Sequence, residues 1–264
     1  MLTIFKNATN HSLILSNFLS TGFTEDLLTT DSIYVGYYKP IGQLYLELAP
    51  HLVENEISVE YWDGSSWSAI DVIDRTFGLK KSGFITWERN IDDQEQHILN
   101  AMVLFWYRIK ITTNDITDFN LKALNLVFSD DNDLLESYPD IMEYLPEGKS
   151  SFVGYHQSAR NYILTYLRNK GKTIKARNAY KLLDQFDLHN FEEVRQASKY
   201  KALSMIFFNE SDQVEDKWYQ KAKDFDRLYS ESIESDFLSI DENDDGKISS
   251  SEAQKIQYIT VQRL

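Results

Sequence analysis

The chain of 264 residues contains no cysteine, and this absence is the most restrictive feature of its composition. Without thiols there can be no disulfide, no thiolate metal ligand and no cysteine nucleophile. Only four prolines and ten glycines are present, while 42% of the residues are hydrophobic and 14% are aromatic. This composition supplies enough apolar side chains for folded cores and argues against a largely disordered chain.

Long apolar runs are also missing. No stretch approaches the roughly eighteen residues that suggest a membrane-spanning helix, and residues 1–6 have no basic start followed by an apolar run. The sequence therefore predicts no transmembrane segment, no membrane partner and no signal peptide. A formal charge of −14 disfavours a broad or sequence-specific nucleic-acid interface, because such an interface needs a basic surface.

Recognisable catalytic motifs are lacking as well. The five histidines are scattered, and the chain has no His-Glu-x-x-His motif, no glycine-rich phosphate loop and no Gly-x-Ser-x-Gly elbow. His156 lies in a helical pattern, where a structural role outweighs a catalytic one. The neighbouring carboxylates of Asp92, Asp93 and Glu95 lie in a polar stretch and are expected to be hydrated. The sequence therefore predicts a protein that is not an enzyme.

One motif carries specific chemistry. Residues 241–252 fit the twelve-residue calcium loop of the EF-hand, with Gly246 at the sixth position, where the chain turns sharply. The predicted Ca²⁺ ligands are five oxygen-bearing side chains and one backbone carbonyl, from Asp241, Asn243, Asp245, Lys247 (carbonyl), Ser249 and Glu252. The alternative is a solvated acidic turn. A single loop directly after a helix is expected to fix the C-terminal segment to that helix.

The pattern of apolar residues before Ser129 indicates strands. Short runs alternate with period two, as at 57–62, 105–111 and 124–128, and turn signals such as Asp63-Gly64 separate them. Because no helical spacers intervene, we expect domain 1–132 to be an antiparallel β-sandwich of about seven to nine strands, starting near residue 30. Residues 92–102 are expected to form a helical turn or a loop.

After Ser129 the period becomes helical, so domain 133–264 is predicted to be an α-helical bundle that carries the calcium loop and a C-terminal arm. Helical patterns cover 155–170, 178–187, a segment starting near 190, and 213–238, which leads directly into the calcium loop. The acidic connector 130–133 is interpreted as a solvated linker, with a second metal site as the alternative. The predicted fold class is therefore α+β with two domains.

The tryptophans suggest two further roles, carbohydrate binding or contact between proteins. Trp62, Trp67 and Trp106 could form a platform for sugar rings, but neighbouring residues of a strand point to opposite faces, so packing or an interface is favoured. On the predicted long helix, Trp218 is a candidate contact between subunits, together with Phe225 and Tyr229.

Several phrases of the chain resemble virion proteins of tailed bacteriophages. The phrases at 33–36, 61–67, 74–83 and 106–109 are similar to phrases in β-sandwich modules of such proteins. Residues 134–252 resemble small helical head–tail adaptors, through a leucine- and proline-containing segment at 134–139, helices at 159–163 and 197–203, and a long closing helix. Typical adaptors are much shorter and lack a leading sandwich.

The resemblance implies a structural virion protein without catalytic residues. It would form a homo-oligomeric ring at the head–tail interface, as an adaptor or neck component that joins the portal to the tail, with portal, tail and neck proteins as partners. Such a protein is made in the host cytoplasm and resides in the virion. The alternative is a calcium-stabilised carbohydrate-binding or virion-decoration module.

Overall fold

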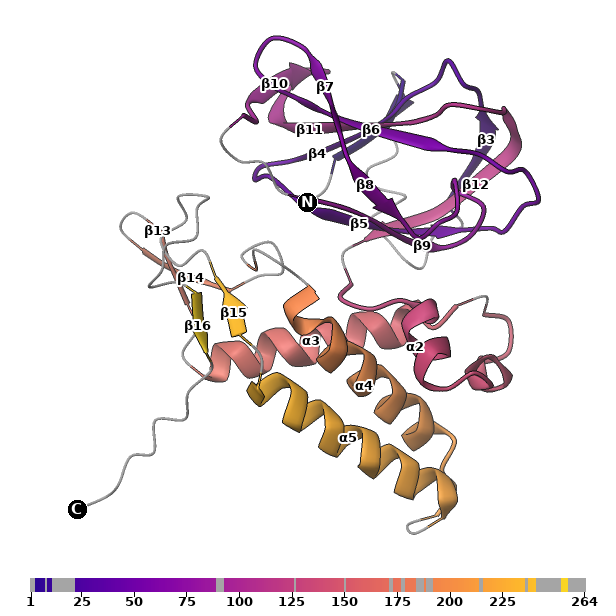
Figure 1. Cartoon of the computed structure of the whole chain (residues 1–264), viewed down its shortest axis with the longest axis vertical. Coiled ribbons are helices and arrows are strands. Elements are labelled where there is room, and N and C mark those ends of the chain that lie inside the picture. The colour runs from indigo at the N-terminus through magenta and orange to yellow at the C-terminus, as the bar shows by residue number, and fades with distance from the viewer. Residues whose placement is uncertain are drawn as a thin grey trace. The chain divides into compact units, whose positions relative to one another are not determined.

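The chain divides into two compact units, Met1–Leu126 and Val127–Leu264, called here the two-sheet unit and the helical unit (Figure 1). The computed structural model describes residues 3–7, 9–10, 22–88, 93–125, 127–149, 151–170, 173–176, 179–183, 188, 192–213, 216–235, 237–240 and 253–255. The predicted α+β class is confirmed, with two large antiparallel sheets in one unit and helices in the other. The predicted boundary at 132/133 falls inside helix α2, Asp131–Ser137, so residues 127–132 belong to the helical unit.

The two-sheet unit contains a seven-stranded and a five-stranded sheet. The first has the order β2-β1-β4-β11-β6-β7, with β10 also paired to β11; its strands are β1 (Thr3–Lys6), β2 (Thr9–Asn10), β4 (Ile33–Tyr37), β6 (Ile57–Trp62), β7 (Trp67–Ile70), β10 (Gln96–Leu99) and β11 (Met102–Ile111). The second has the order β3-β12-β5-β9-β8, from β3 (Phe23–Leu27), β5 (Gln43–Leu48), β8 (Val72–Asp74), β9 (Gly83–Trp87) and β12 (Ile116–Asn125).

Alternation along β11 explains how the seven-stranded sheet buries one face. Tyr107 and Ile109 are 1% exposed, whereas Arg108 between them is half-buried on the other face. Trp87 of the five-stranded sheet lies 5.0 Å from Tyr107 between ring centroids, so aromatic side chains of both sheets meet in one core. The Trp87 indole N–H and the Tyr107 hydroxyl both donate to the carbonyl of Ile41 at 2.8 Å, which satisfies their polar atoms inside that core.

Short strands account for the difference between the predicted and the observed strand number. The described part of this unit has twelve strands, β1 to β12, of which β1, β2 and β3 precede residue 30. Residues 96–99 form strand β10 where a helical turn or a loop was expected. Strands of two to five residues contain too few alternations to stand out from irregular chain.

The helical unit contains α2, the 3-10 helix η1 (Ile141–Tyr144), α3 (Val153–Asn169), α4 (Glu192–Asn209) and α5 (Lys217–Ser235). Two short antiparallel strand pairs join β13 (Thr173–Ala176) to β14 (Ala179–Leu182), and β15 (Phe237–Ser239) to β16 (Ala253–Lys255). The predicted helix at 178–187 is wrong, because 179–182 pairs as a strand with β13. The predicted helix at 213–238 is shorter than expected, since β15 begins two residues after α5 ends.

The acidic connector is neither a solvated linker nor a metal site. Asp130 and Asp133 are 1% and 2% exposed and form a capping box at the start of α2. The guanidinium of Arg195 on α4 donates to Asp133 Oδ1 through Nη2 at 2.6 Å and through Nε at 3.0 Å. These carboxylates therefore start a helix and fix it to α4.

Among the described residues, no helix is long and apolar enough to cross a lipid bilayer.

Candidate functional site

The predicted calcium loop, with ligands Asp241, Asn243, Asp245, Lys247, Ser249 and Glu252, lies outside the described residues. The chain on either side of it is described: Ser239 of β15 pairs with Ala253 of β16. Strands therefore flank residues 241–252, and the expectation that α5 leads directly into the loop is wrong. Carboxylate, amide, hydroxyl and carbonyl oxygens form a donor set that suits a hard cation. In the described ranges, no cluster of three His, Asp or Glu side chains could hold a metal.

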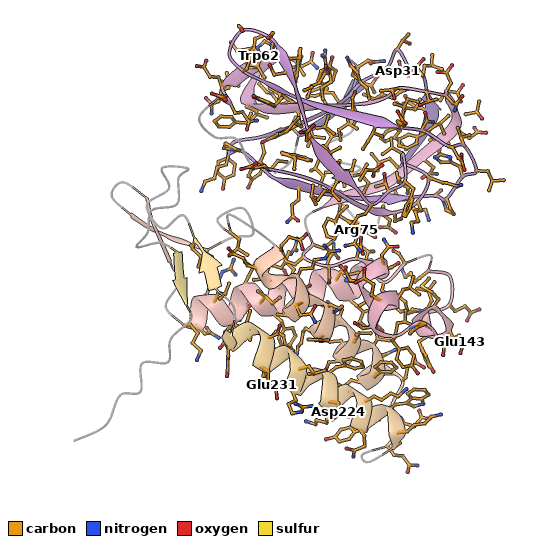
Figure 2. The ribbon with its side chains drawn as sticks, in the orientation of Figure 1. Asp31, Trp62, Arg75, Glu143, Asp224 and Glu231 are labelled. Atoms are coloured by element: carbon orange, nitrogen blue, oxygen red, sulfur yellow. The ribbon has the colours of Figure 1, made fainter. Side chains whose placement is uncertain are left out.

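Trp62 and Trp67 lie opposite each other on β6 and β7, with ring centroids 5.7 Å apart (Trp62 is labelled in Figure 2). The imidazole of His97 stacks on Trp62 at 3.9 Å, and the guanidinium carbon of Arg108 lies 4.6 Å from the Trp67 ring centroid. Both tryptophans are half-buried. Their neighbours cover part of the rings, so Trp62 and Trp67 form a packed aromatic and cationic cluster, and only the uncovered part of each ring is open to a ligand.

A charged pair borders this cluster. Arg108 donates from Nε to the carboxylate of Glu60 on the adjacent strand, and Lys110 Nζ lies 3.4 Å from the same carboxylate. Burial alone would raise the pKa of Glu60, but the hydrogen bond and the charge of Arg108 outweigh burial and hold this pKa below its usual value. Glu60 is therefore a fixed anion that positions Arg108 against Trp67.

Trp106 is 0% exposed, so the hypothesis that it belongs to a surface platform or an interface is wrong. It lies directly opposite Gly36 of β4, and a Cβ atom on Gly36 would lie 2.6 Å from the Trp106 ring. Its indole N–H donates to the carbonyl of His97 at 3.0 Å. Glycine leaves the space that the ring fills, and Trp106 packs as a core residue.

Of the α5 residues predicted to contact a neighbouring subunit, Tyr229 is buried, whereas Trp218 and Phe225 are half-buried against α4, so a subunit contact through their uncovered parts stays a prediction. Phe207 of α4 is fully buried, and the rings of Trp218 and Phe225 stack on it, each with a centroid distance of 5.7 Å. Tyr229 is 8% exposed, and burial raises its pKa to about 12. These residues hold α5 on α4 within the helical unit.

A buried network in the helical unit has the residue types of a hydrolase triad. Ser129 Oγ is 2.9 Å from His156 Nδ1, and His156 Nε2 is 3.1 Å from the carboxylate of Asp131. Ser198 Oγ lies 2.8 Å from Ser129 Oγ. Because Ser129 and His156 are 0% exposed, no substrate can reach the hydroxyl. The network joins α2, α3 and α4 and is structural.

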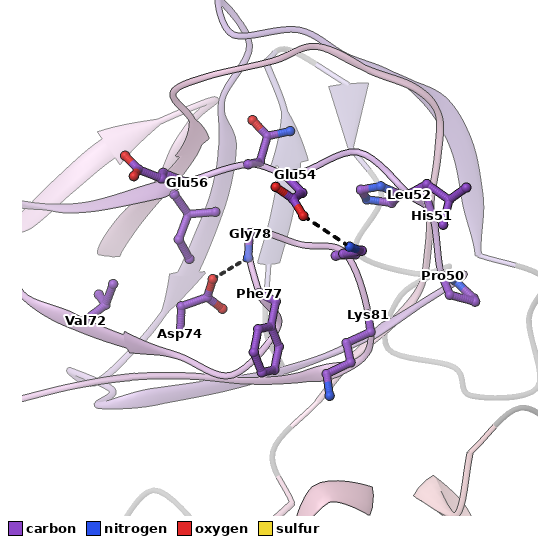
Figure 3. A pocket seen from close by; sticks show the side chains of 13 residues that line it. Pro50, His51, Leu52, Glu54, Glu56, Val72, Asp74, Phe77, Gly78 and Lys81 are labelled. Atoms are coloured by element: carbon purple, nitrogen blue, oxygen red, sulfur yellow. Dashed lines mark hydrogen bonds and ion pairs between the residues drawn. The ribbon is translucent and has the colours of Figure 1, made fainter.

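A groove of about 900 Å³ in the two-sheet unit is the strongest candidate for a binding site (Figure 3). Ile57 at the start of β6 lines it from one sheet, and Val72 and Asp74 of β8 line it from the other. Two connections complete its walls, residues 50–56 before β6 and residues 77–81 between β8 and β9. The groove is therefore built by both sheets and two loops.

The loop between β8 and β9 is organised by Asp74. The Asp74 carboxylate accepts hydrogen bonds from the backbone N–H groups of Thr76 at 2.7 Å and Gly78 at 2.6 Å. The Thr76 hydroxyl accepts from the N–H of Leu79 at 2.9 Å. Phe77, Gly78 and Leu79 have φ angles of 56°, 69° and 66°. Left-handed backbone costs about 1–2 kcal/mol at each non-glycine residue, so this network holds a strained loop in place.

The side chain of His51 links the wall 50–56 to the wall 77–81 by hydrogen bonds. Its Nε2 lies 2.9 Å from the carbonyl of Leu79, and its Nδ1 accepts the N–H of Val53 at 3.2 Å. These two contacts require a neutral ring protonated on Nε2. Burial lowers the pKa of His51, and the charge of Lys80 lowers it further.

The rim of the groove is apolar and charged. Leu52 and Phe77 are 91% and 62% exposed. Glu54 and Glu56 are exposed on the wall 50–56, and the wall 77–81 contributes two half-buried lysines, Lys80 and Lys81. The Nζ of Lys81 lies 4.5 Å from the Phe77 ring centroid. Large exposed apolar side chains around a hollow indicate a surface that binds.

Known proteins give little further information. No family model matches the chain, and no curated protein sequence matches it. A solved structure described as "CpGH89CBM32-6 produced by Clostridium perfringens" is similar over 47% of this chain and 90% of that chain, with 11% sequence identity and a TM-score of 0.31. A TM-score this low does not establish a common fold, so the likeness supports no functional argument.

Proposed function

We propose that this chain is a non-enzymatic structural protein of a tailed-phage virion, a ring-forming head–tail adaptor or neck component that joins the portal to the tail. The starting point is the resemblance of residues 134–252 to helical adaptors. The short helices α2 and η1, followed by α3, α4 and the long α5, are consistent with that pattern. We take the two large sheets to close into a β-sandwich, which the contact between Trp87 and Tyr107 supports.

The observation that carries the proposal is the exposed apolar rim of the groove. Leu52 and Phe77 project from loops that hydrogen bonds to Asp74 and His51 hold in one conformation. Rigid, exposed, large apolar side chains favour contact between proteins. Among the described residues, the triad-like constellation around His156 is buried and serves packing. Binding rather than chemistry is therefore the function that these surfaces support.

The proposal also includes a calcium site in the C-terminal segment. The six residues Asp241, Asn243, Asp245, Lys247, Ser249 and Glu252 would bind one Ca²⁺ between β15 and β16. The ion would then fix the C-terminal segment, and its binding energy would become local folding energy. Glu252→Gln is expected to lower the melting temperature in calcium and to leave the melting temperature in chelator nearly unchanged. Equal melting of both proteins in calcium would argue against an occupied loop.

Electron microscopy of the purified full chain tests the assembly. Closed rings of uniform diameter are the expected result, with native mass spectrometry giving the number of subunits. A strict monomer at all concentrations, absent from purified virions, would refute the proposal.

A carbohydrate-binding or virion-decoration module is the second candidate. It is favoured by Trp62 and Trp67, which lie half-buried on one face beside Glu60 and Arg108. Glycan-array screening of the full chain, with Trp62→Ala as the matched variant, decides this: binding that depends on Trp62 would favour the module.

A further inference from the structure

The groove combines a hollow with exposed apolar side chains that could fill the same hollow on another copy of the chain. The hollow of about 900 Å³ has Ile57 and Val72 among its apolar lining residues. Leu52 and Phe77 line the same groove, yet they are 91% and 62% exposed and project from its rim. A surface that combines a hollow with apolar projections can fit a second copy of itself.

The charges of the groove are separated by wall. Glu54 and Glu56 come from the connection before β6, and Lys80 and Lys81 come from the connection between β8 and β9. The two sides approach each other only loosely within one molecule, with Lys80 Nζ 3.8 Å from Glu54 Oε1. The side chain of Glu54 is 89% exposed, so this pair contributes little to stability and can exchange partners.

We propose that a second copy of this chain docks at this groove through a two-fold contact. Leu52 and Phe77 of each copy enter the hollow of the other, and the acidic wall of each copy faces the basic wall of its partner. A two-fold interface uses the same patch on both subunits, so the patch must be complementary to itself. The groove has the parts that such a contact needs, which are a hollow with apolar projections and one acidic and one basic wall.

The net charge of the chain explains why pairing needs both an acidic and a basic wall. Two copies at −14 each repel over most of their surfaces. Opposite charges at the contact offset this repulsion locally and fix the register of the two copies. Each copy contributes two apolar projections and four charged side chains, so we expect a weak contact that forms pairs of the free protein at high concentration. The inference does not rest on the phage assignment, because it concerns pairs of the free protein.

Charge reversal tests the two-fold geometry. Glu54→Lys/Glu56→Lys makes both walls basic, and Lys80→Glu/Lys81→Glu makes both walls acidic. Each variant alone should pair at least about tenfold more weakly than the unmodified chain, because like charges then face each other. An equimolar mixture should form mixed pairs with affinity close to that of the unmodified chain. Sedimentation velocity at low salt, with one variant fluorescently labelled, measures this pairing.

Cysteine cross-linking locates the contact. The chain has no cysteine, so Leu52→Cys introduces a unique thiol at the rim. Ile98→Cys is the matched control, since Ile98 is 66% exposed on β10 and does not line the groove. A short bismaleimide should join two copies through residue 52 and leave residue 98 unjoined. Both charge-reversed variants should lose the cross-link alone and regain it when mixed.

Two results would overturn the inference: a mixture of the charge-reversed variants that pairs no better than either alone, or equal cross-linking at residues 52 and 98. Thermal melting of every variant is checked first, because Lys80 and Lys81 are half-buried and a loss of folding would itself abolish pairing. Electron microscopy separates this test from that of the proposed function. Intact rings without residue-52 pairs would remove only the two-fold contact, and pairs without rings would remove only the proposed adaptor function.

Discussion

The two units use polar side chains in opposite ways. In the two-sheet unit, Asp63 accepts hydrogen bonds from the N–H groups of Ser65 and Ser66, and Asp74 organises the loop that presents Phe77. In the helical unit, His156 and Asp133 are buried and join helices to one another. Polar groups therefore shape the surface of the first unit and position the interior of the second. Binding should therefore depend on the surface loops of the two-sheet unit, and stability on the buried polar contacts of the helical unit.

The largest expected effect is in the aromatic core of the helical unit. Phe207→Ala removes a fully buried ring that stacks between Trp218 and Phe225, and should destabilise this unit by about 3–5 kcal/mol. Urea unfolding followed by far-ultraviolet circular dichroism measures this, because the described α-helices all lie in this unit. Phe208→Ala is the control, with a side chain that is 39% exposed and an expected loss below about 1 kcal/mol. Similar losses for both would contradict the described core.

Breaking the buried ion pair should have the next largest effect. Asp133→Ala removes one of the two carboxylates that Arg195 contacts, the other being the exposed Glu192, together with half of the capping box, for an expected loss of about 2 kcal/mol. The control is Glu231→Ala on α5 (Figure 2), whose pair with Arg227 is 2.6 Å long but about 60% exposed on both sides. That loss should stay below about 0.5 kcal/mol in the same assay. A negligible loss for Asp133→Ala would show that the buried pair does not hold α2.

Acid should weaken the two-sheet unit through His51. The folded chain holds the pKa of His51 below its ordinary value of 6.5, so folding favours the neutral ring. This contribution to stability is fully present above pH 6.5 and is lost as pH falls below it, because the protonated ring can no longer accept the N–H of Val53. Tryptophan fluorescence in urea between pH 7.5 and 5 measures the slope, and His51→Gln should flatten it. An unchanged slope in the variant would exclude His51 as the cause.

The smallest expected effect on stability is at the rim. Phe77→Gly replaces an exposed side chain at φ 56° with the residue that best tolerates this backbone, so stability should be unchanged or rise by up to about 1 kcal/mol. Gly78→Ala is the contrasting change, since its Cβ would overlap the carbonyl of Asn55 and its φ is 69°. That variant should lose stability. A clear loss for Phe77→Gly would mean that the ring supports the loop instead of serving contact.

Regular periodicity explains which parts of the fold were predictable. Residues 57–62 show period two because one face of β6 is apolar and packs inward at Val59, and the predicted run coincides with the strand. The helical pattern at 155–170 corresponds closely to α3 for the same reason. At 179–182 the strand has only four residues and no clear period, so its pairing with β13 decides its structure. Periodicity in the sequence identifies long helices and strands, whereas pairing with another segment determines whether a short segment becomes a strand.

The groove could not be predicted from sequence. Its two walls, 50–56 and 77–81, become neighbours only after both sheets form. A left-handed backbone is signalled by Gly78, but nothing in the sequence indicates it at Phe77 and Leu79. The tryptophans were conspicuous by residue type, yet Trp106 is fully buried and Trp218 packs half-buried against the core of the helical unit. Aromatic residues predict packing and binding equally well until burial is known.

Native mass spectrometry of the full chain in calcium tests the central claim, that this protein assembles into a closed oligomer through rigid surfaces. The account predicts one closed oligomer of defined subunit number, which electron microscopy shows as a ring. A monomer that persists across all concentrations, with the Leu52→Cys variant unjoined by cross-linker, would contradict it.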